Sequence, residues 1–359
     1  MSLIDSLTIL VTDRCNFSCD YCFQNNPVGK DVSLNGALAA IEYAYDNSRD
    51  ELNILFSGGE PLLKFGLIKG CIEFVDDLKR KHQRSLSYSI ITNGSLVDSN
   101  ILSFLSKHKF YVQYSFDVYL RDDSHEIEKF EQGNRVLKKL LNSKDISLST
   151  NTVFSPETVD KIFESVVYLI DSGVQNIGIG LDQTVFWDKN SLDTFRKELS
   201  KVKKIVVENY KSTGNILVDY FDLMESNGIK MCSAGGGKLV ITPNGEFWGC
   251  QSFYFLDWNK CEEKRGNYLY GNITDLKKEN FNKKRNDIRS NYKKFKTDNF
   301  RTDKSKCFLC DYLEECIICP TQKDLSIGKK RSLFHVPDYI CEINKIIIDL
   351  NREFKKEVK

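Results

Sequence analysis

The sequence predicts an α/β fold: a partial (β/α)6 TIM-like barrel followed by a small cysteine-rich α+β domain. In the first half of the chain, apolar β-like runs alternate about six times with helical patterns, which indicates parallel strands joined by crossover helices. Six such units are too few to close an eight-stranded barrel, so we expect an open one. Beyond about residue 214, glycine and cysteine become frequent. The predicted domains are therefore 1–213 and 214–359.

The expected elements follow from apolar periodicity and from turn residues. Strands are expected at Leu7–Val11, Leu52–Phe56, Leu86–Thr92, Phe110–Phe116, Ser147–Val153 and Asn176–Gly180. Helices are expected near Asn35–Tyr45, Gly66–Lys81, Asn100–Ser106, Glu126–Leu141, Thr158–Ser172 and Ser191–Tyr210. In the second domain, Pro243-Asn244-Gly245 predicts a hairpin turn between Lys238–Ile241 and Glu246–Trp248, and a helix is expected at Ile343–Phe354.

Composition narrows the class of protein. The chain has 359 residues, a net charge of +1 and a globular balance of 41% hydrophobic to 28% charged residues. No apolar run reaches the roughly 20 residues that span a bilayer, and the N-terminus lacks the pattern of a secretory signal. Twelve cysteines without a signal peptide favour metal binding over disulfides. We expect a cytoplasmic protein that binds no membrane.

Three of these cysteines directly follow the first expected strand. Cys15, Cys19 and Cys22 are separated by three and two residues. Thiolates this close can converge on one metal centre, and a strand end is where an α/β barrel holds its chemistry. Because four cysteines close an iron–sulfur cluster, three leave one iron open for another ligand.

The motif Cys15-x3-Cys19-x2-Cys22, with Tyr21 before the last cysteine, resembles the cluster motif of the radical S-adenosylmethionine (SAM) enzymes. The resemblance implies that SAM chelates the fourth iron of a [4Fe-4S] cluster and is cleaved there to a 5′-deoxyadenosyl radical. An electron donor such as flavodoxin or ferredoxin would reduce the cluster.

Four further strand ends fit the same family. Gly58-Gly59-Glu60-Pro61 resembles its Gly-Gly-Glu-Pro segment, which contacts the SAM amino group. Thr92-Asn93-Gly94 looks like its Thr-Asn-Gly. Ser115-Phe116-Asp117 resembles its Ser-Leu-Asp-Gly, although Val118 replaces the glycine. The remaining SAM contacts that the resemblance implies are less specific: Lys129, for which a solvated helix face is the alternative, and Leu181, for which core packing is the alternative.

The C-terminal cysteines resemble the seven-cysteine SPASM extension, which binds two auxiliary [4Fe-4S] clusters. The resemblance implies Cys232, Cys250 and Cys319 as ligands of the first cluster, and Cys307, Cys310, Cys316 and Cys341 as ligands of the second. Cys261 is a candidate fourth ligand of the first cluster; the alternatives are an open iron or an unligated thiol. Cys71, on an apolar helix face, is interpreted as a small buried hydrophobe.

The expectations about the substrate come from positions at which this chain departs from the sequence pattern of its relatives in this family. Sulfatase-maturing members carry a catalytic Asp directly after the cysteine that Cys250 matches, whereas this chain has Gln251, a candidate substrate-pocket residue. We expect a peptide substrate, modified by a crosslink, a thioether or an epimerised residue. We expect no N-terminal leader-recognition domain, so a separate leader-binding protein or another docking surface would be needed. The basic stretch Lys277–Lys306 is a candidate docking surface or a solvated face. Rival interpretations are a small-molecule substrate, sulfatase-type oxidation, or a non-catalytic electron-transfer or zinc protein; nucleic acid is disfavoured.

Overall fold

The computed structural model describes residues 3–24, 29–81, 85–118, 124–182, 184–224, 232–276, 281–295, 307, 309–316, 318–321, 330 and 332–359. Its strands are β1 (Ile4–Thr12), β2 (Ser48–Gly58), β3 (Ser85–Thr92), β4 (Tyr111–Ser115), β5 (Ser147–Phe154), β6 (Ile177–Leu181), β7 (Lys238–Ile241), β8 (Glu246–Trp248) and β9 (Leu269–Asn272). Its helices are α1 (Leu34–Asp46), α2 (Phe65–Lys81), α3 (Ser99–Lys107), α4 (Ser124–Leu141), α5 (Ile162–Asp171), α6 (Lys189–Thr213), α7 (Gln251–Tyr254), α8 (Phe281–Tyr292) and α9 (Asp338–Val358).

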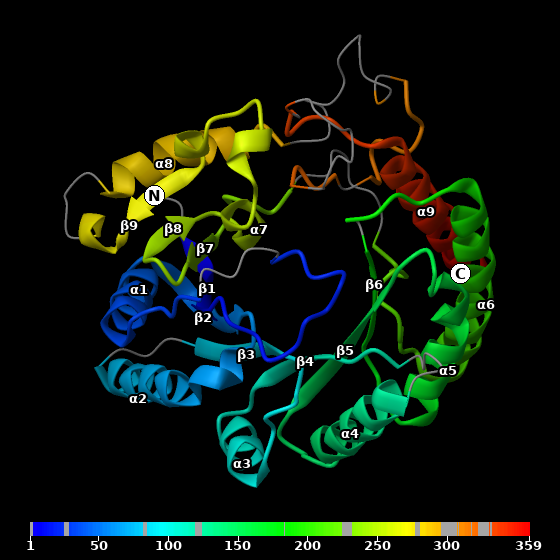
Figure 1. Cartoon of the computed structure of the whole chain (residues 1–359), viewed down its shortest axis with the longest axis horizontal. Helices are drawn as coiled ribbons and strands as arrows, with labels where there is room; N and C mark the ends of the chain where they lie inside the picture. Colours follow the sequence, from blue (N-terminus) through cyan, green and yellow to red (C-terminus); the bar gives the residue numbers. More distant parts are fainter. Residues whose placement is uncertain are drawn as a thin grey trace.

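The strands form one sheet in the order β6-β5-β4-β3-β2-β1-β7-β8-β9. Strands β1 to β6 pair in parallel and curve into an open arc, with α1 to α6 on its outer side (Figure 1). The predicted partial barrel is therefore confirmed. The predicted hairpin is β7 and β8, and its first strand pairs in parallel with β1. The sheet thus continues past residue 214, and the division into domains there stays a prediction.

The two faces of the barrel sheet carry different side chains. The outer face is apolar: Ile9, Ile54 and Val112 are fully buried beneath the helices. The inner face is more polar: on it, Ser115 of β4 lies opposite Asn151 of β5. A side chain that points outward reaches the helices, whereas one that points inward reaches the hollow where barrel enzymes bind ligands.

Local chemistry explains where the helices begin and end. Asp98 and Asp188 accept hydrogen bonds from backbone N–H groups in the first turns of α3 and α6. Gly214, at a φ of 76°, ends α6 in the left-handed conformation that favours glycine. These residues set the helix boundaries within a few positions of those expected from periodicity.

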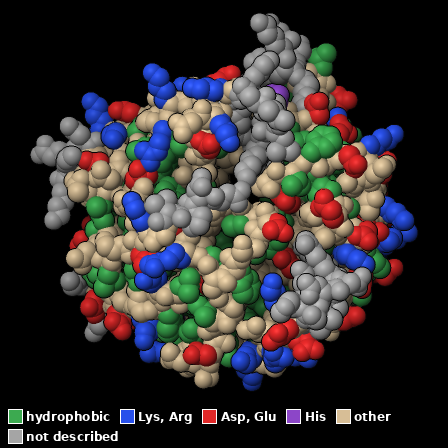
Figure 2. All heavy atoms as spheres, in the orientation of Figure 1, with side chains coloured by type: hydrophobic (Ala, Val, Ile, Leu, Met, Phe, Trp, Pro, Cys, Tyr) green, Lys and Arg blue, Asp and Glu red, His purple; other side chains and the backbone are tan. Residues whose placement is uncertain are grey.

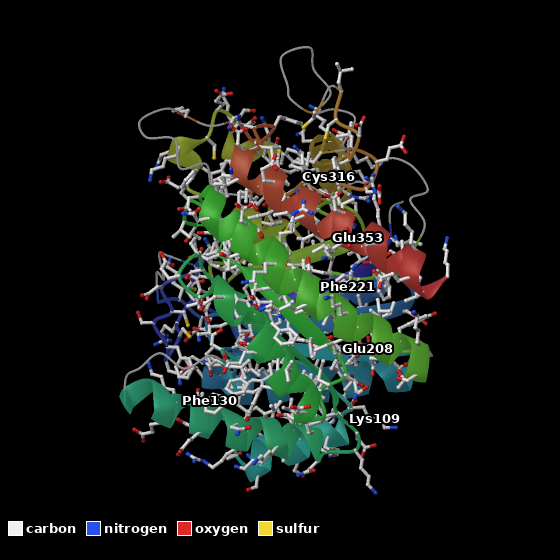
Figure 3. All side chains as sticks on the ribbon, turned by 90° about the vertical axis from the view of Figure 1, so that its right-hand side faces the viewer. Lys109, Phe130, Glu208, Phe221, Cys316 and Glu353 are labelled. Atoms are coloured by element: carbon white, nitrogen blue, oxygen red, sulfur yellow. The ribbon has the colours of Figure 1, made fainter. Side chains whose placement is uncertain are left out.

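Helix α9 lies across α6, as the side view shows (Figure 3). At their crossing, Lys203 of α6 pairs with Glu353 at 2.7 Å and with Glu357 at 2.6 Å. The C-terminal helix thereby covers the outer side of the barrel. On the face seen in Figure 2, acidic and basic side chains are interspersed, in keeping with the net charge of +1.

Candidate functional site

The cysteine loop begins where β1 ends. Cys15 is exposed, whereas Cys19 and Cys22 are partly buried. The backbone N–H of Cys22 donates to the carbonyl of Cys19 at 3.1 Å, and the N–H of Phe17 donates to the Cys15 Sγ at 3.4 Å. Burial raises the pKa values of Cys15 and Cys19, and the neighbouring Cys22 thiol raises them further. The three thiols are therefore close neighbours at the carboxyl end of the first strand.

Two glycines at the end of β2 dock this loop. The N–H of Gly59 donates to the Thr12 carbonyl at 2.7 Å, and the N–H of Glu60 donates to the Arg14 carbonyl at 2.8 Å. A Cβ on Gly59 would lie 2.1 Å from the Arg14 oxygen, and one on Gly58, whose φ is 134°, would lie 2.4 Å from the Thr12 oxygen. Glycine is needed here so that the β2 backbone can approach the cysteine loop.

Glu60 ties the ends of β2 and β3 together. Its side chain is fully buried, and its carboxylate accepts from the Leu62 N–H at 3.0 Å, the Thr92 hydroxyl at 2.8 Å and the Asn93 N–H at 2.8 Å. Burial raises its pKa, and these three hydrogen bonds oppose the shift. Pro61 then opens a short 3-10 helix. The Glu60 carboxylate thus has a structural role, and its predicted contact with SAM stays a prediction.

Two more predicted residues lie beside the loop. The Asn93 side chain donates to the Asn16 Oδ1 at 3.0 Å and lies 3.8 Å from the Cys15 Sγ. The Tyr21 hydroxyl donates to the Asp117 Oδ2 at 2.5 Å, and burial raises the Tyr21 pKa so that the hydroxyl keeps its proton. The segments that follow β3 and β4 are therefore joined to the cysteine loop by side-chain hydrogen bonds.

The other predicted SAM contacts are more dispersed. Ser115 is partly buried on the inner face of the barrel, and Leu181 is partly buried at the end of β6. Lys129 is exposed on α4. The side chains of residues 124–127, just before it, lie outside the described part of the chain. Among the described residues, no side-chain hydrogen bond or ion pair joins Ser115, Leu181 or Lys129 to the cysteine loop, and their role as SAM contacts stays a prediction.

The C-terminal cysteines form two neighbourhoods. Burial raises the pKa of Cys232 to about 11, and the nearby thiols of Cys319 and Cys250 contribute. Burial likewise raises the pKa of Cys316 to about 12, with contributions from the other thiols of its own neighbourhood, Cys341, Cys307 and Cys310. These neighbourhoods have the same members as the two ligand sets that the sequence predicts.

Two cysteines differ from the rest. Cys71 is fully buried in α2, and burial raises its pKa to about 12, as expected for a thiol that packs as a small hydrophobe. Cys261 is also buried, and its thiol donates to the Asp257 carbonyl at 3.5 Å. Its role as a fourth ligand stays a prediction.

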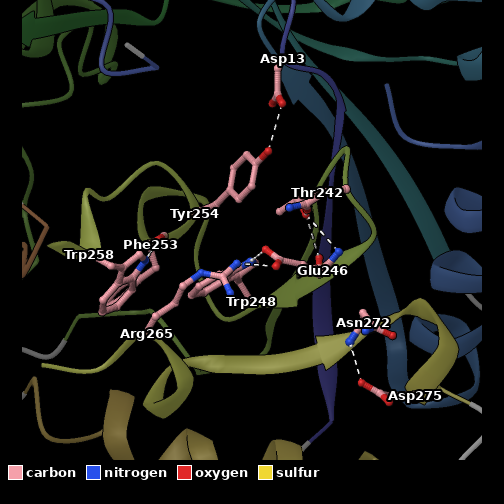
Figure 4. A network of polar contacts seen from close by, with 11 residues as sticks. Asp13, Thr242, Glu246, Trp248, Phe253, Tyr254, Trp258, Arg265, Asn272 and Asp275 are labelled. Carbon is pink, nitrogen blue, oxygen red and sulfur yellow. Dashed lines mark hydrogen bonds and ion pairs between the residues drawn. The ribbon is translucent and has the colours of Figure 1, made fainter. Parts of the chain in front are cut away.

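A hydrogen bond joins the cysteine loop to the segment after Cys250. The Tyr254 hydroxyl of α7 donates to the Asp13 Oδ2 at 3.0 Å (Figure 4). Asp13 is 4% exposed, and its Oδ1 is buried without a hydrogen-bond partner in the described structure. Gln251 begins the same short helix and is partly buried. Sequence reasoning missed both Asp13 and Tyr254; the one available signal was the position of Asp13 at the end of an apolar strand.

The comparisons with known proteins agree with this geometry. Residues 9–166 match the model of the radical SAM superfamily. The chain is 32% identical to an uncharacterized protein of Methanocaldococcus jannaschii, over 76% of this chain and 90% of the relative. It is 28% identical to the radical SAM cyclopropyl synthase TigE of Paramaledivibacter caminithermalis, over 72% of this chain and 60% of that relative. The chain belongs to the radical SAM superfamily.

Solved structures show the same fold along nearly the whole chain. Native anSMEcpe with bound AdoMet and the Cp18Cys peptide superposes with a TM-score of 0.72 at 19% identity, covering 98% of each chain. Streptococcus suis SuiB bound to the precursor peptide SuiA superposes with a TM-score of 0.61 at 18% identity, covering 94% of this chain and 77% of SuiB. Among the described residues, no helix is long and apolar enough to cross a membrane.

Membership of the superfamily implies SAM and a [4Fe-4S] cluster, and the residues present fit them. Three neighbouring thiols at a strand end supply the cysteine donors that such a cluster takes. The described residues contain no group of three or more His, Cys, Asp or Glu side chains placed to hold a single metal ion. In a four-iron cluster each thiolate binds its own iron, so the sulfur atoms need not meet at one point.

Proposed function

We propose that this enzyme modifies a peptide, using SAM and three [4Fe-4S] clusters. The observation that carries the proposal is the division of ten cysteines into three spatial neighbourhoods, one at the end of β1 and two in the C-terminal part. Cys15, Cys19 and Cys22 would hold the first cluster. The other two would be held by Cys232, Cys250 and Cys319, and by Cys307, Cys310, Cys316 and Cys341.

The bound cofactors supply the radical that removes a hydrogen atom from an unreactive carbon. The protein positions the reactants and excludes side reactions. Gly58 and Gly59 hold the cysteine loop against β2, Asn93 contacts it from the end of β3, and Asp117, beyond β4, accepts from its Tyr21. The proposed SAM-binding set remains Tyr21, Gly58, Gly59, Glu60, Pro61, Asn93, Ser115, Asp117, Lys129 and Leu181.

A peptide substrate is supported by two structural relatives of the same fold. anSMEcpe and SuiB were each solved with a bound peptide, and both superpose on most of this chain. We propose that the substrate lies between the cysteine loop and Gln251, where Asp13 and Tyr254 meet. Gln251 cannot accept a proton near neutral pH, which argues against sulfatase-type oxidation that uses an Asp at this position.

The proposed partners are an electron donor, such as flavodoxin or ferredoxin, and a peptide recognised directly or through a leader-binding protein. Part of the basic stretch is unsuited to docking, because Arg285 and Arg289 of α8 are buried. Residues 277–280 and 296–306 of that stretch lie outside the described part of the chain.

The test is mass spectrometry of short peptides encoded beside the gene, after anaerobic incubation with reconstituted enzyme, SAM and reductant. A crosslink or thioether removes two hydrogen atoms from the peptide, and epimerisation in deuterated water adds one deuteron in place of a hydrogen. Either mass change supports the proposal. Unchanged peptides, together with conversion of a small molecule from the same gene cluster, would favour the small-molecule alternative.

A further inference from the structure

We propose that Asp219 anchors a binding site for a cationic side chain of the substrate, an ammonium or a guanidinium group. The site lies at the open edge of the barrel, against β6. The inference rests on the proposed peptide substrate, and its test uses binding alone, so that it can fail separately from the proposed chemistry.

The segment that carries Asp219 extends the sheet beyond β6. After α6 the chain runs alongside β6, where the Ile177 N–H donates to the Leu217 carbonyl at 2.8 Å and the Asp219 N–H donates to the Ile177 carbonyl at 3.1 Å. The Asp219 Oδ1 also accepts from the Ile179 N–H at 3.4 Å. Backbone pairing on both sides therefore fixes this carboxylate against the edge strand.

The carboxylate lies on the inner face of the barrel. Gly178 is opposite Asn151, and Asn151 is opposite the inward-facing Ser115. A Cβ on Gly178 would lie 2.9 Å from the Asn151 Oδ1 and 3.4 Å from the Asp219 Oδ2. A Cβ on Gly180 would lie 3.4 Å from the Asn151 Nδ2. The two glycines themselves therefore add no side chain to the surface between Asn151 and Asp219.

Asp219 also lines a cavity of about 290 Å³ between its own segment and α9. A volume near the lower end of those seen for ligand pockets suits one long side chain. Ile347 and Ile348 supply an apolar wall, against which methylene groups can pack. Asn344, at the same wall, donates to the Cys316 Sγ at 3.5 Å, so the cavity extends toward the second C-terminal cysteine neighbourhood.

The charges in this cavity leave one carboxylate for a ligand. Asp222 pairs with Lys355 at 3.2 Å, and Glu315 pairs with Arg352. Within the described part of the chain, Asp219 has no ion pair with a lysine or arginine. Asp219 is exposed, so its carboxylate is accessible to an incoming cation. The cavity therefore offers the Asp219 carboxylate and an apolar wall to an incoming cation.

The test compares the binding of three probes to the anaerobically reconstituted full chain: N-acetyl-lysine methylamide, N-acetyl-arginine methylamide and the uncharged N-acetyl-norleucine methylamide. Ligand-observed NMR titration gives the dissociation constants. We expect at least one cationic probe to bind about tenfold more tightly than norleucine, as a charge-assisted hydrogen bond allows. Asp219→Asn should remove that preference and leave norleucine binding unchanged.

Asp193→Asn is the matched control, since it removes the same charge from an exposed position on α6. It should keep the preference of the wild type. Equal binding of all three probes by the wild type would overturn the proposal. So would a preference that survives in Asp219→Asn, because the cation would then bind elsewhere.

Discussion

The Tyr254 hydroxyl donates to the Asp13 carboxylate at 3.0 Å, across 241 positions of sequence (Figure 4). This contact joins the residue that follows β1 to the short helix that follows Cys250. The proposed radical-generating loop and the first C-terminal cysteine neighbourhood are thus joined by a partly buried hydrogen bond. Its position makes it a structural link between the two parts of the proposed active site.

Tyr254→Phe should lower the free energy of unfolding by about 1–3 kcal/mol, because it leaves the buried Asp13 carboxylate without its donor. Anaerobic denaturant titration measures the loss. Tyr111→Phe is the control: this ring is 41% exposed, and its substitution should change stability by less than about 0.5 kcal/mol. Equal stability of the two variants would mean that the hydrogen bond contributes nothing.

Gly59→Ala should displace the cysteine loop, because its Cβ would lie 2.1 Å from the Arg14 carbonyl oxygen. Reconstituted protein should then lose about four of its roughly twelve iron atoms. Gly66→Ala, with nothing within 4 Å of the added Cβ, should keep all its iron. Full iron in Gly59→Ala would show that the loop tolerates the clash.

Replacing a cysteine of a proposed cluster should remove iron, whereas replacing Cys71 should not. We expect Cys316→Ala to lower the iron content by up to about four atoms per chain. Cys71→Ala should leave iron unchanged, because that thiol is buried in α2 away from the three neighbourhoods. Iron and acid-labile sulfide assays measure both. Loss of iron in Cys71→Ala, without loss in Cys316→Ala, would contradict the assignment of the cluster ligands.

The sequence predicted the barrel well, because each strand and helix has its own periodic signal. The family resemblance also implied the sets of cysteine ligands, and that assignment stays a prediction. The sequence did not predict that β7 would pair with β1, since such pairing depends on residues over two hundred positions apart. Its assignment of Gly58 and Gly59 to a ligand stays a prediction; it did not foresee that a Cβ on Gly58 would meet the β1 backbone and one on Gly59 the backbone of the cysteine loop. Asp219 has no motif, and only the register of β6 reveals its position.

Lys203 should stabilise the crossing of α6 and α9 in a pH-dependent way. Burial lowers its pKa, but Glu353 and Glu357 outweigh this and raise it above 10.5. A cation with a raised folded pKa contributes stability below its unfolded pKa, and that contribution is lost as pH rises through the folded value. Lys203→Met should cost about 1 kcal/mol at pH 8, since both glutamates are partly solvated. The difference from wild type should shrink above about pH 10.5; a difference that stays constant to pH 11 would contradict the ion pairs.

The most direct test of the proposed function is SAM cleavage by the reconstituted enzyme. With dithionite and SAM under anaerobic conditions, the wild type should release 5′-deoxyadenosine, measured by chromatography. The triple variant with Cys15, Cys19 and Cys22 changed to Ala should release none, yet keep the iron of its C-terminal cysteines. Undiminished 5′-deoxyadenosine from the triple variant would contradict the assignment of these three cysteines as the radical-generating site.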